Sequence, residues 1–299
     1  MFAIPRKSAA LYRRIFNRVK NFGIVADEID RDFATAVRTG IEAGLRRYEI
    51  RFLTTGRAPL CDPSELREVE RIAAREGVEI TALSPGLFKL TDTEPAFRRE
   101  MTEVYPKAAE WAHRWRLPGL IVFGFHKPGA TEENALSMPR AEVPNRIVDW
   151  LAEAGGRAAA DGLLLMIEPE PICWADTCNI AAAMIERAGP AGLRINYDPG
   201  NVAWLRQFDP IAEFEAAAPW IANVHVKDLL PMTAGSTRPR FVPAGHGMID
   251  YRAHFNALRR AGYQGPVSLE PHMDGRLETI RACKEALEKS YEIHTSQSD

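Results

Sequence analysis

The sequence predicts a single (β/α)8 barrel, a TIM barrel of the α/β class, and three observations lead to this fold. Short apolar runs rich in β-forming residues alternate with longer helical stretches along the 299 residues, which is the pattern of parallel βα units. Eight such runs can be counted, spaced by roughly 25 to 45 residues, which is room for a strand, a helix and two loops. No linker or change in composition divides the eight units, so one domain is expected.

The predicted strands begin after a basic N-terminal segment. They cover residues 22–27, 47–51, 79–84, 120–125, 163–168, 193–198, 222–227 and 267–270. Residues 1–21 contain six basic residues and no acidic one, and their apolar positions have helical spacing, which predicts a short helical extension at the bottom of the barrel. A targeting or polyanion-binding segment is the alternative. We therefore expect an extension over 1–21 and a barrel domain over 22–299.

The connections between the strands contain clear helix ends and two long loops. Asp62 can cap a helix that has Pro63 in its first turn, Glu65 would complete a capping box, and Gly77 ends the helix. Gly44 likewise ends the helix that precedes the second strand. The loops at 127–144 and 229–251 follow strands four and seven, so they leave the catalytic face of a barrel. They are candidates for lid or substrate-binding loops.

Composition and charge exclude several classes of protein. A chain with 46% hydrophobic and 26% charged residues can bury a large core, so disordered and fibrous classes are excluded. The net charge of −2 provides no bulk attraction to nucleic acid or an anionic membrane. No apolar run approaches the roughly 20 residues of a membrane span, and the four cysteines have no CxxC spacing. We expect a cytoplasmic protein that binds a small molecule but neither nucleic acid nor a membrane, with a homo-oligomer as an alternative to a monomer.

The last four strands show which side chains point into the barrel, because side chains alternate between the two faces of a strand. Apolar residues occupy one parity, and this parity should face the helices. Polar residues occupy the other, at Glu168 and Glu170, Asn196 and Asp198, His225 and Lys227, and Ser268, Glu270 and His272. The interior of an ordinary barrel holds Val, Ile or Leu at such positions. The polar parity therefore predicts a site at the carboxyl ends of these strands.

Four of these residues form a plausible metal-binding ring. Charged side chains on successive strands are costly in a closed interior unless they are paired or bind a cation. Glu168, Asp198, His225 and Glu270 offer three carboxylates and one imidazole, a hard ligand set that suits Mn²⁺, Mg²⁺ or Co²⁺, with Zn²⁺ also possible. The sequence thus predicts one divalent metal ion, with Mn²⁺ preferred.

Four segments around this ring resemble the sugar phosphate isomerase/epimerase superfamily, the xylose isomerase-like barrels. They are residues 167–169 (IEP), 196–201 (NYDPGN), 224–228 (VHVKD) and 268–272 (SLEPH). The resemblance implies that all four ring residues bind the metal. It also implies that Glu168 and Glu270 exchange a proton with a bound ketose through an enediolate, while Asp198 and His225 act as ligands alone. His225 must then be neutral, so activity should fall at acid pH.

Five further residues are expected to bind substrate. Asn201 stands where similar ketose epimerases often have a histidine, and His246 replaces a frequently acidic residue. Arg240 lies where such enzymes have a substrate-binding arginine. Lys227 shares the inward parity of strand seven, and His126 follows strand four.

Several neighbours of the ring have less specific interpretations. Lys89 and Lys127, like His126, follow strands three and four and could contact an acidic or phosphorylated substrate. Asp228 could orient the His225 ring or start a helix. Glu49 and Arg51 are interpreted as a structural ion pair. His254 is expected at a helix surface.

The leading functional hypothesis is a metal-dependent sugar isomerase or epimerase acting on a keto-sugar or polyol derivative. A lyase or dehydratase using the same glutamates is the alternative. An apurinic endonuclease would need three metals and a phosphate-binding mouth, and the chain shows one ligand set and no net basic charge. A non-catalytic sugar-binding barrel is the remaining class, and the complete ligand set argues against it.

Overall fold

The computed structural model describes residues 22–292 apart from 140, 190, 206–208, 232–235 and 237. Within this part of the chain, eight parallel strands close into a barrel in the order β1-β12-β9-β8-β7-β6-β5-β2. The strands are β1 (Gly23–Val25), β2 (Arg47–Ile50), β5 (Glu79–Leu83), β6 (Gly119–Phe123), β7 (Leu164–Glu168), β8 (Leu193–Tyr197), β9 (Ile221–Val226) and β12 (Val267–Leu269). The predicted barrel and its eight strands are confirmed. The predicted extension over 1–21 lies outside the described residues.

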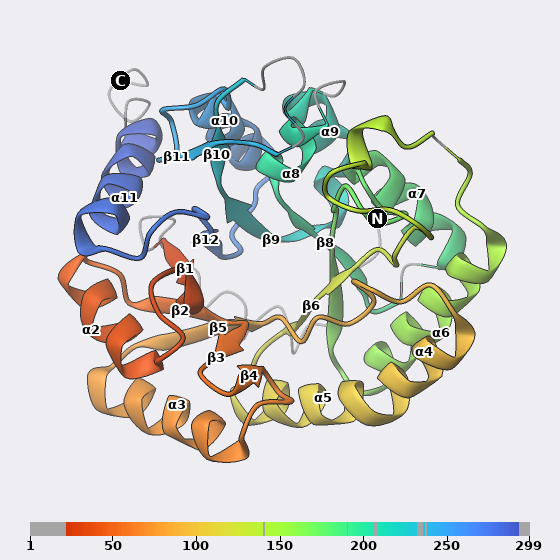
Figure 1. The fold of residues 1–299 in the computed structure, drawn as a ribbon, viewed down its shortest axis with the longest axis horizontal. Coiled ribbons are helices and arrows are strands. Elements are labelled where there is room, and N and C mark those ends of the chain that lie inside the picture. The colour runs from red at the N-terminus through yellow and green to blue at the C-terminus, as the bar shows by residue number, and fades with distance from the viewer. Residues whose placement is uncertain are drawn as a thin grey trace.

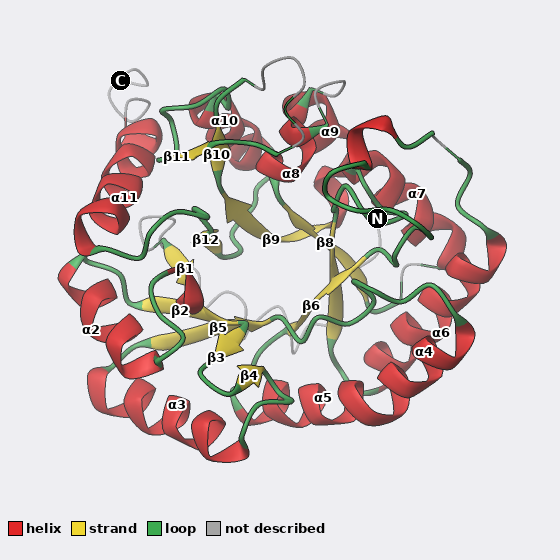
Figure 2. Cartoon of the chain, viewed as in Figure 1, coloured by secondary structure: helices red, strands yellow, loops and turns green. Residues whose placement is uncertain are grey.

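Helices surround the barrel and cover the outer face of its strands (Figures 1 and 2). They are α2 (Phe33–Glu42), α3 (Pro63–Glu76), α4 (Glu94–Arg99), α5 (Tyr105–Arg114), α6 (Asn145–Ala160), α7 (Cys178–Ala188), α8 (Pro199–Trp204), α9 (Pro210–Ala217), α10 (Tyr251–Arg260) and α11 (Leu277–Glu292). Single turns occur at η1 (Ala26–Glu28), η2 (Glu100–Val104), η3 (Ala135–Ser137) and η4 (Ala218–Trp220). Among the described residues, no helix combines the length and the apolar character that a membrane span requires.

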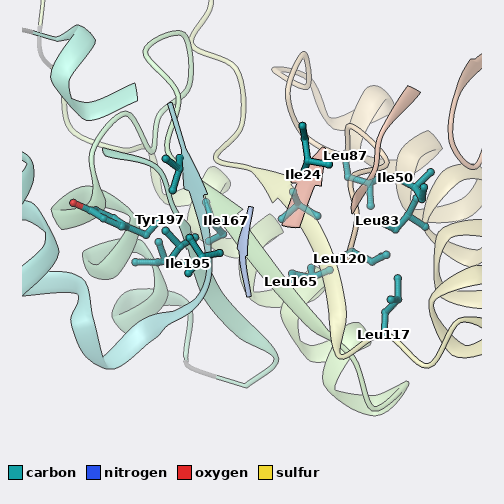
Figure 3. Close-up of a cluster of buried hydrophobic side chains, with 14 of the residues drawn as sticks. Ile24, Ile50, Leu83, Leu87, Leu117, Leu120, Leu165, Ile167, Ile195 and Tyr197 are labelled. Atoms are coloured by element: carbon teal, nitrogen blue, oxygen red, sulfur yellow. The ribbon is translucent and has the colours of Figure 1, made fainter. Parts of the chain in front are cut away.

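The alternation of apolar and polar side chains separates the outer core from the barrel interior. Leu165 and Ile167 of β7 and Ile195 of β8 are fully buried in the large core cluster (Figure 3), which also contains helix residues such as Leu151 and Met184. A second, smaller cluster of Ala82, Ile121 and Met166 has the opposite parity and fills the barrel interior. In β7 the next inward position after Met166 is Glu168, so the interior changes from apolar to polar at the carboxyl end of the strand.

The predicted ends of α3 are confirmed, but its capping box is not. Asp62 accepts a hydrogen bond from the Ser64 N–H, and Gly77 ends the helix with φ 63°, a left-handed conformation that favours glycine. The Thr55 hydroxyl accepts from the Asp62 N–H at 2.8 Å. Glu65 in turn accepts from the Thr55 N–H and hydroxyl. The capping box is absent because Thr55 already satisfies the N–H that Glu65 would bind.

Two antiparallel hairpins, which were not predicted, extend from the carboxyl ends of barrel strands. β3 (Phe52–Leu53) pairs with β4 (Gly56–Arg57) directly after β2. β10 (Asp228–Leu229) pairs with β11 (Phe241–Val242) inside the long loop predicted at 229–251. Both hairpins therefore stand at the mouth of the barrel, where active sites of this fold are found.

Candidate metal and active site

The structure brings Glu168, Asp198, His225 and Glu270 together in one buried cluster. Glu168 ends β7, Asp198 follows β8, His225 lies in β9, and Glu270 follows β12. One ligand atom of each residue lies within 4.8 Å of those of the other three. Their spacing is explained by the barrel, because neighbouring parallel strands place their carboxyl ends at the same rim.

Asp198 has one oxygen engaged by a helix and one that faces the cluster and the Lys227 ammonium. Its Oδ1 accepts hydrogen bonds from the N–H groups of Gly200 and Asn201, at 2.8 and 3.1 Å, and so caps α8. Its Oδ2 is buried and accepts no hydrogen bond from any described residue, although Lys227 Nζ lies 2.8 Å away as an ion pair. A buried carboxylate oxygen that a cation already contacts, among two further carboxylates and an imidazole, fits a metal ligand.

His225 is oriented by Glu49. Its Nε2 lies 2.7 Å from Glu49 Oε2, and since a carboxylate only accepts, Nε2 is assigned as the donor. Its Nδ1 faces the cluster, 3.3 Å from Glu270 Oε2 and 3.7 Å from Glu168 Oε1. A carboxylate behind a histidine is the usual support of a metal-binding imidazole. Burial alone would lower the pKa of His225, but Glu49, Glu168 and Glu270 raise it well above its ordinary value, so a proton and a cation would compete for Nδ1.

Two interpretations from the sequence are corrected by this arrangement. Asp228 does not contact His225. It accepts hydrogen bonds from the backbone N–H groups of Gly245, Gly247 and Ile249 and thereby holds the loop between β11 and α10. Glu49 and Arg51 are not an ion pair either. Residues two apart on a strand share one face, but the Glu49 carboxylate is engaged by His225 and Asn223. Arg51 instead contacts Asp27, Glu28 and Glu270.

The two glutamates of the cluster have different surroundings. Glu270 contacts two cations, since Lys227 Nζ lies 2.7 Å from its Oε2 and Arg51 bonds its Oε1. Burial raises the pKa of Glu270, but Lys227 and His272 bring it well below the ordinary value. Glu168 instead accepts from two amides, Asn196 at 3.2 Å and Asn201 at 3.3 Å. Burial and Glu270 raise the pKa of Glu168, whereas His225 and Lys227 lower it. The lowering is the larger effect, so the pKa of Glu168 also lies below its ordinary value.

The predicted substrate-binding residues divide into two groups. Asn201 and Lys227 are buried and contact the cluster directly. His126 is half-buried, with Nε2 3.1 Å from the Ala130 carbonyl. Arg240 is exposed directly before β11, and His246 is exposed in the loop that Asp228 holds. The last three do not line the pocket beside the cluster, and their binding of substrate stays a prediction.

The pocket beside the cluster is lined by Lys89, which was predicted to face an acidic or phosphorylated substrate, and by several residues that had no predicted role. Besides Glu168, His225 and Glu270, its wall includes Arg51, Phe52, Arg57, Ser84, Lys89 and Phe123. Lys89 forms an ion pair with Glu170 at 2.6 Å. The sequence signal for this wall is the inward parity of Glu49 and Arg51 in the second strand and the polar residues that follow it.

A closed parallel barrel with a buried Glu, Asp and His cluster at the carboxyl ends of its strands defines a class of α/β-barrel proteins with a candidate divalent-metal site. The chain belongs to the Xylose isomerase-like TIM barrel family, whose model matches residues 37–293. The family that the four sequence segments indicated is therefore confirmed.

Individual relatives are more distant. The chain is 25% identical over 201 residues to the L-ribulose-5-phosphate 3-epimerase UlaE of Shigella flexneri serotype 5b (strain 8401), a match that covers 66% of each chain. It thus spans less than two thirds of the length of this relative. Among solved structures, the IOLI protein with a binding zinc atom is 17% identical at TM-score 0.71, covering 92% of this chain and 99% of that one. The probable 3-DHS dehydratase AsbF from Bacillus anthracis is 17% identical at TM-score 0.68, covering 90% and 98%. At these identities, the structures show the fold alone.

Proposed function

We propose that the protein is a metal-dependent epimerase or isomerase of a keto-sugar or related polyol derivative. The observation that carries this proposal is that two glutamates, Glu168 and Glu270, meet in one buried cluster with a third carboxylate and an imidazole. They come from β7 and β12, which β8 and β9 separate in the barrel. Two carboxylates on different sides of one pocket can remove a carbon-bound proton and return one from the other face.

Each residue has a separate role in this proposal. Glu168 and Glu270 are both held ionised, Glu270 beside Lys227 and Arg51, so either can accept the carbon-bound proton, and its partner, once protonated, returns one from the other face. Asp198 and His225 would hold the metal together with both glutamates. A bound divalent cation would supply electrostatic stabilisation of the negative charge that develops when a proton leaves carbon. The similarity to an L-ribulose-5-phosphate 3-epimerase supports this class of reaction.

The proposal is tested with Glu168→Gln and Glu270→Gln, assayed with Mn²⁺ on a panel of ketoses in D₂O. The wild type should incorporate solvent deuterium at carbon while the substrate otherwise keeps its mass. Either variant should lose turnover by about 10²- to 10⁴-fold, the usual contribution of a positioned acid or base. Glu79→Gln, on the barrel strand β5 and paired with Arg47, is the matched control. Full turnover in either glutamine variant would rule out the two-base scheme.

A lyase on the same site is a second candidate, and His272 is the observation that favours it. Its ring lies at the pocket wall with Nδ1 3.0 Å from Glu28 Oε1 and Nε2 3.2 Å from Lys227 Nζ. An imidazole in this place could protonate a leaving hydroxyl after a glutamate removes the proton on the adjacent carbon. The fold likeness to a probable dehydratase is compatible with this reaction. Loss of one water from the substrate, in place of deuterium incorporation at constant mass, would identify it.

A further inference from the structure

Arg57 is a cation of the pocket wall without an acidic partner. It lies in β4, opposite Phe52 in the β3–β4 hairpin, and lines the pocket together with Glu168 and Glu270. The other cations at the site are paired: Arg51 with three carboxylates, Lys89 with Glu170, and Lys227 with Asp198 and Glu270. In the part of the chain that the structure describes, no carboxylate lies within ion-pair distance of Arg57.

The Arg57 guanidinium is nonetheless held in a defined position. Its Nε donates to the Ser84 carbonyl and its Nη2 to the Ser84 hydroxyl, both at 3.0 Å. Its Cζ lies 4.8 Å from the centre of the Phe52 ring and 5.7 Å from that of Phe123, within the range of cation–π contact. Gly86 leaves the room for it, because a Cβ there would lie 2.7 Å from Arg57 Nε.

The remaining donors of Arg57 are free for a ligand. A guanidinium has five N–H groups, and Ser84 takes one at Nε and one at Nη2, so that Nη1 donates to no described residue. Burial, and then the nearby Arg51, lower the pKa of Arg57 to about 10, which still leaves it charged at neutral pH. Glu168, Asp27 and Glu170 act on Arg57 only from beyond ion-pair distance, so this half-buried charge is incompletely compensated, and an anion that enters the pocket would reduce that cost.

We propose that Arg57 binds a carboxylate group of the substrate, which makes the substrate a keto-sugar acid. The inference rests on the proposed function, since it places the reacting carbons at Glu168 and Glu270 and the carboxylate across the pocket at Arg57. A planar guanidinium fork matches a planar carboxylate in two parallel hydrogen bonds. One unpaired cation balances the single charge of a carboxylate, whereas a phosphate would bring up to two charges to a wall whose other cations are already paired.

The test measures binding affinity and does not depend on the rate of turnover. Calorimetric titration of the Mn²⁺-loaded protein compares three ketoses that differ in one terminal group: D-fructose, D-fructuronate and D-fructose 6-phosphate. We expect the carboxylate to bind roughly 10- to 100-fold more tightly than the neutral sugar, the range of a charge-assisted pair. Arg57→Met should remove this preference while the affinity for D-fructose stays the same.

Two further variants keep the test interpretable. Arg114→Met removes one positive charge at the surface, where Arg114 pairs with Glu70, and should leave the preference intact. Ser84→Ala keeps the Arg57 charge but removes the acceptor of its Nη2, and should weaken the preference partially. Melting curves of every variant identify any that does not fold.

The outcomes separate this inference from the proposed function. An equal carboxylate preference in the wild type and Arg57→Met, or none in the wild type, overturns the inference. A stronger, Arg57-dependent preference for the phosphate overturns the assignment of a carboxylate. If Arg57-dependent binding of D-fructuronate is found but no ketose exchanges deuterium, the anion site stands and the epimerase proposal fails.

Discussion

At the scale of single residues, the orientation of His225 depends on a chain of polar side chains beneath the cluster. Glu49 accepts from His225 through Oε2 and from Asn223 through Oε1, at 2.7 and 3.1 Å. Asn223 also donates to Asn196 at 2.9 Å, and Asn196 donates to Glu168. Two of the proposed metal ligands are thus connected through buried amides. A change at Glu49 should therefore alter the affinity for the metal, although Glu49 itself is not one of the proposed ligands.

Replacing Glu49 by glutamine should weaken metal binding by about 10- to 100-fold, the usual effect of losing a carboxylate that supports a metal-binding histidine. The amide oxygen can still accept from His225 Nε2, but the negative charge that makes Nδ1 a better ligand is removed. Calorimetric titration with Mn²⁺ measures the affinity. Glu79→Gln, which also replaces a glutamate by glutamine but on strand β5, should bind Mn²⁺ with the affinity of the wild type. Unchanged affinity in Glu49→Gln would show that Glu49 has no part in the metal site.

At the scale of elements, α10 packs on the barrel through a buried histidine. His254 is 3% exposed, so the expectation of a surface position was wrong. It shares one helix face with Tyr251, Phe255 and Leu258, all buried, and this spacing marks the core-facing stripe of a helix. Its Nδ1 lies 3.0 Å from the Tyr197 hydroxyl, which donates to the Pro210 carbonyl. His254 thereby connects α10, β8 and the start of α9.

Burial lowers the pKa of His254 from 6.5 to about 4, which makes the stability of the fold depend on pH. The neutral ring is favoured in the folded state, so its contribution is complete above pH 6.5 and is lost as the pH falls from 6.5 towards 4. The expected loss of unfolding free energy is about 3 kcal/mol. Urea unfolding at pH 7.5 and pH 4.5 measures it.

The variant His254→Gln isolates this contribution, because other buried groups titrate in the same window. Burial raises the pKa of Asp198 to about 6, and this group changes stability in the opposite direction as the pH falls. The glutamine amide can keep a hydrogen bond to Tyr197 but does not titrate. The stability difference between the wild type and His254→Gln should therefore shrink towards acid pH. A difference that stays constant from pH 7.5 to pH 4.5 would show that His254 does not titrate as inferred.

At the scale of the whole molecule, the barrel and the four-residue cluster were predictable because both follow from periodicity. Strand alternation separates Glu168 from Ile167 and His225 from Val224, and parallel strands place such residues at a common rim. The β3–β4 hairpin was not predictable in this way, since its strands have two residues each. The position of Arg57 in the pocket wall could therefore not be predicted. The contact of His225 with Glu49 was not predictable either. It depends on which strands face each other across the barrel, and Glu49 on β2 is 176 residues away from His225 in the sequence.

The assembly of the cluster from four strands also predicts that metal stabilises the entire fold. Glu168, Asp198, His225 and Glu270 come together only when β7, β8, β9 and β12 are paired, so a cation should bind the folded state alone. At a Mn²⁺ concentration of 100 times the dissociation constant, the stabilisation is about 2.7 kcal/mol, which corresponds to a rise in Tm of roughly 5 to 10 °C. Melting curves with Mn²⁺ and with EDTA measure this shift.

The matched variant is Asp198→Asn, because asparagine caps a helix about as well as aspartate and so keeps the Oδ1 contacts that begin α8. The change removes the charge at the oxygen that faces the cluster. The variant also loses the buried ion pair with Lys227, so its rise in Tm with Mn²⁺ is measured against its own melting curve in EDTA, and this rise should be small. A rise equal to that of the wild type would place the stabilising cation elsewhere.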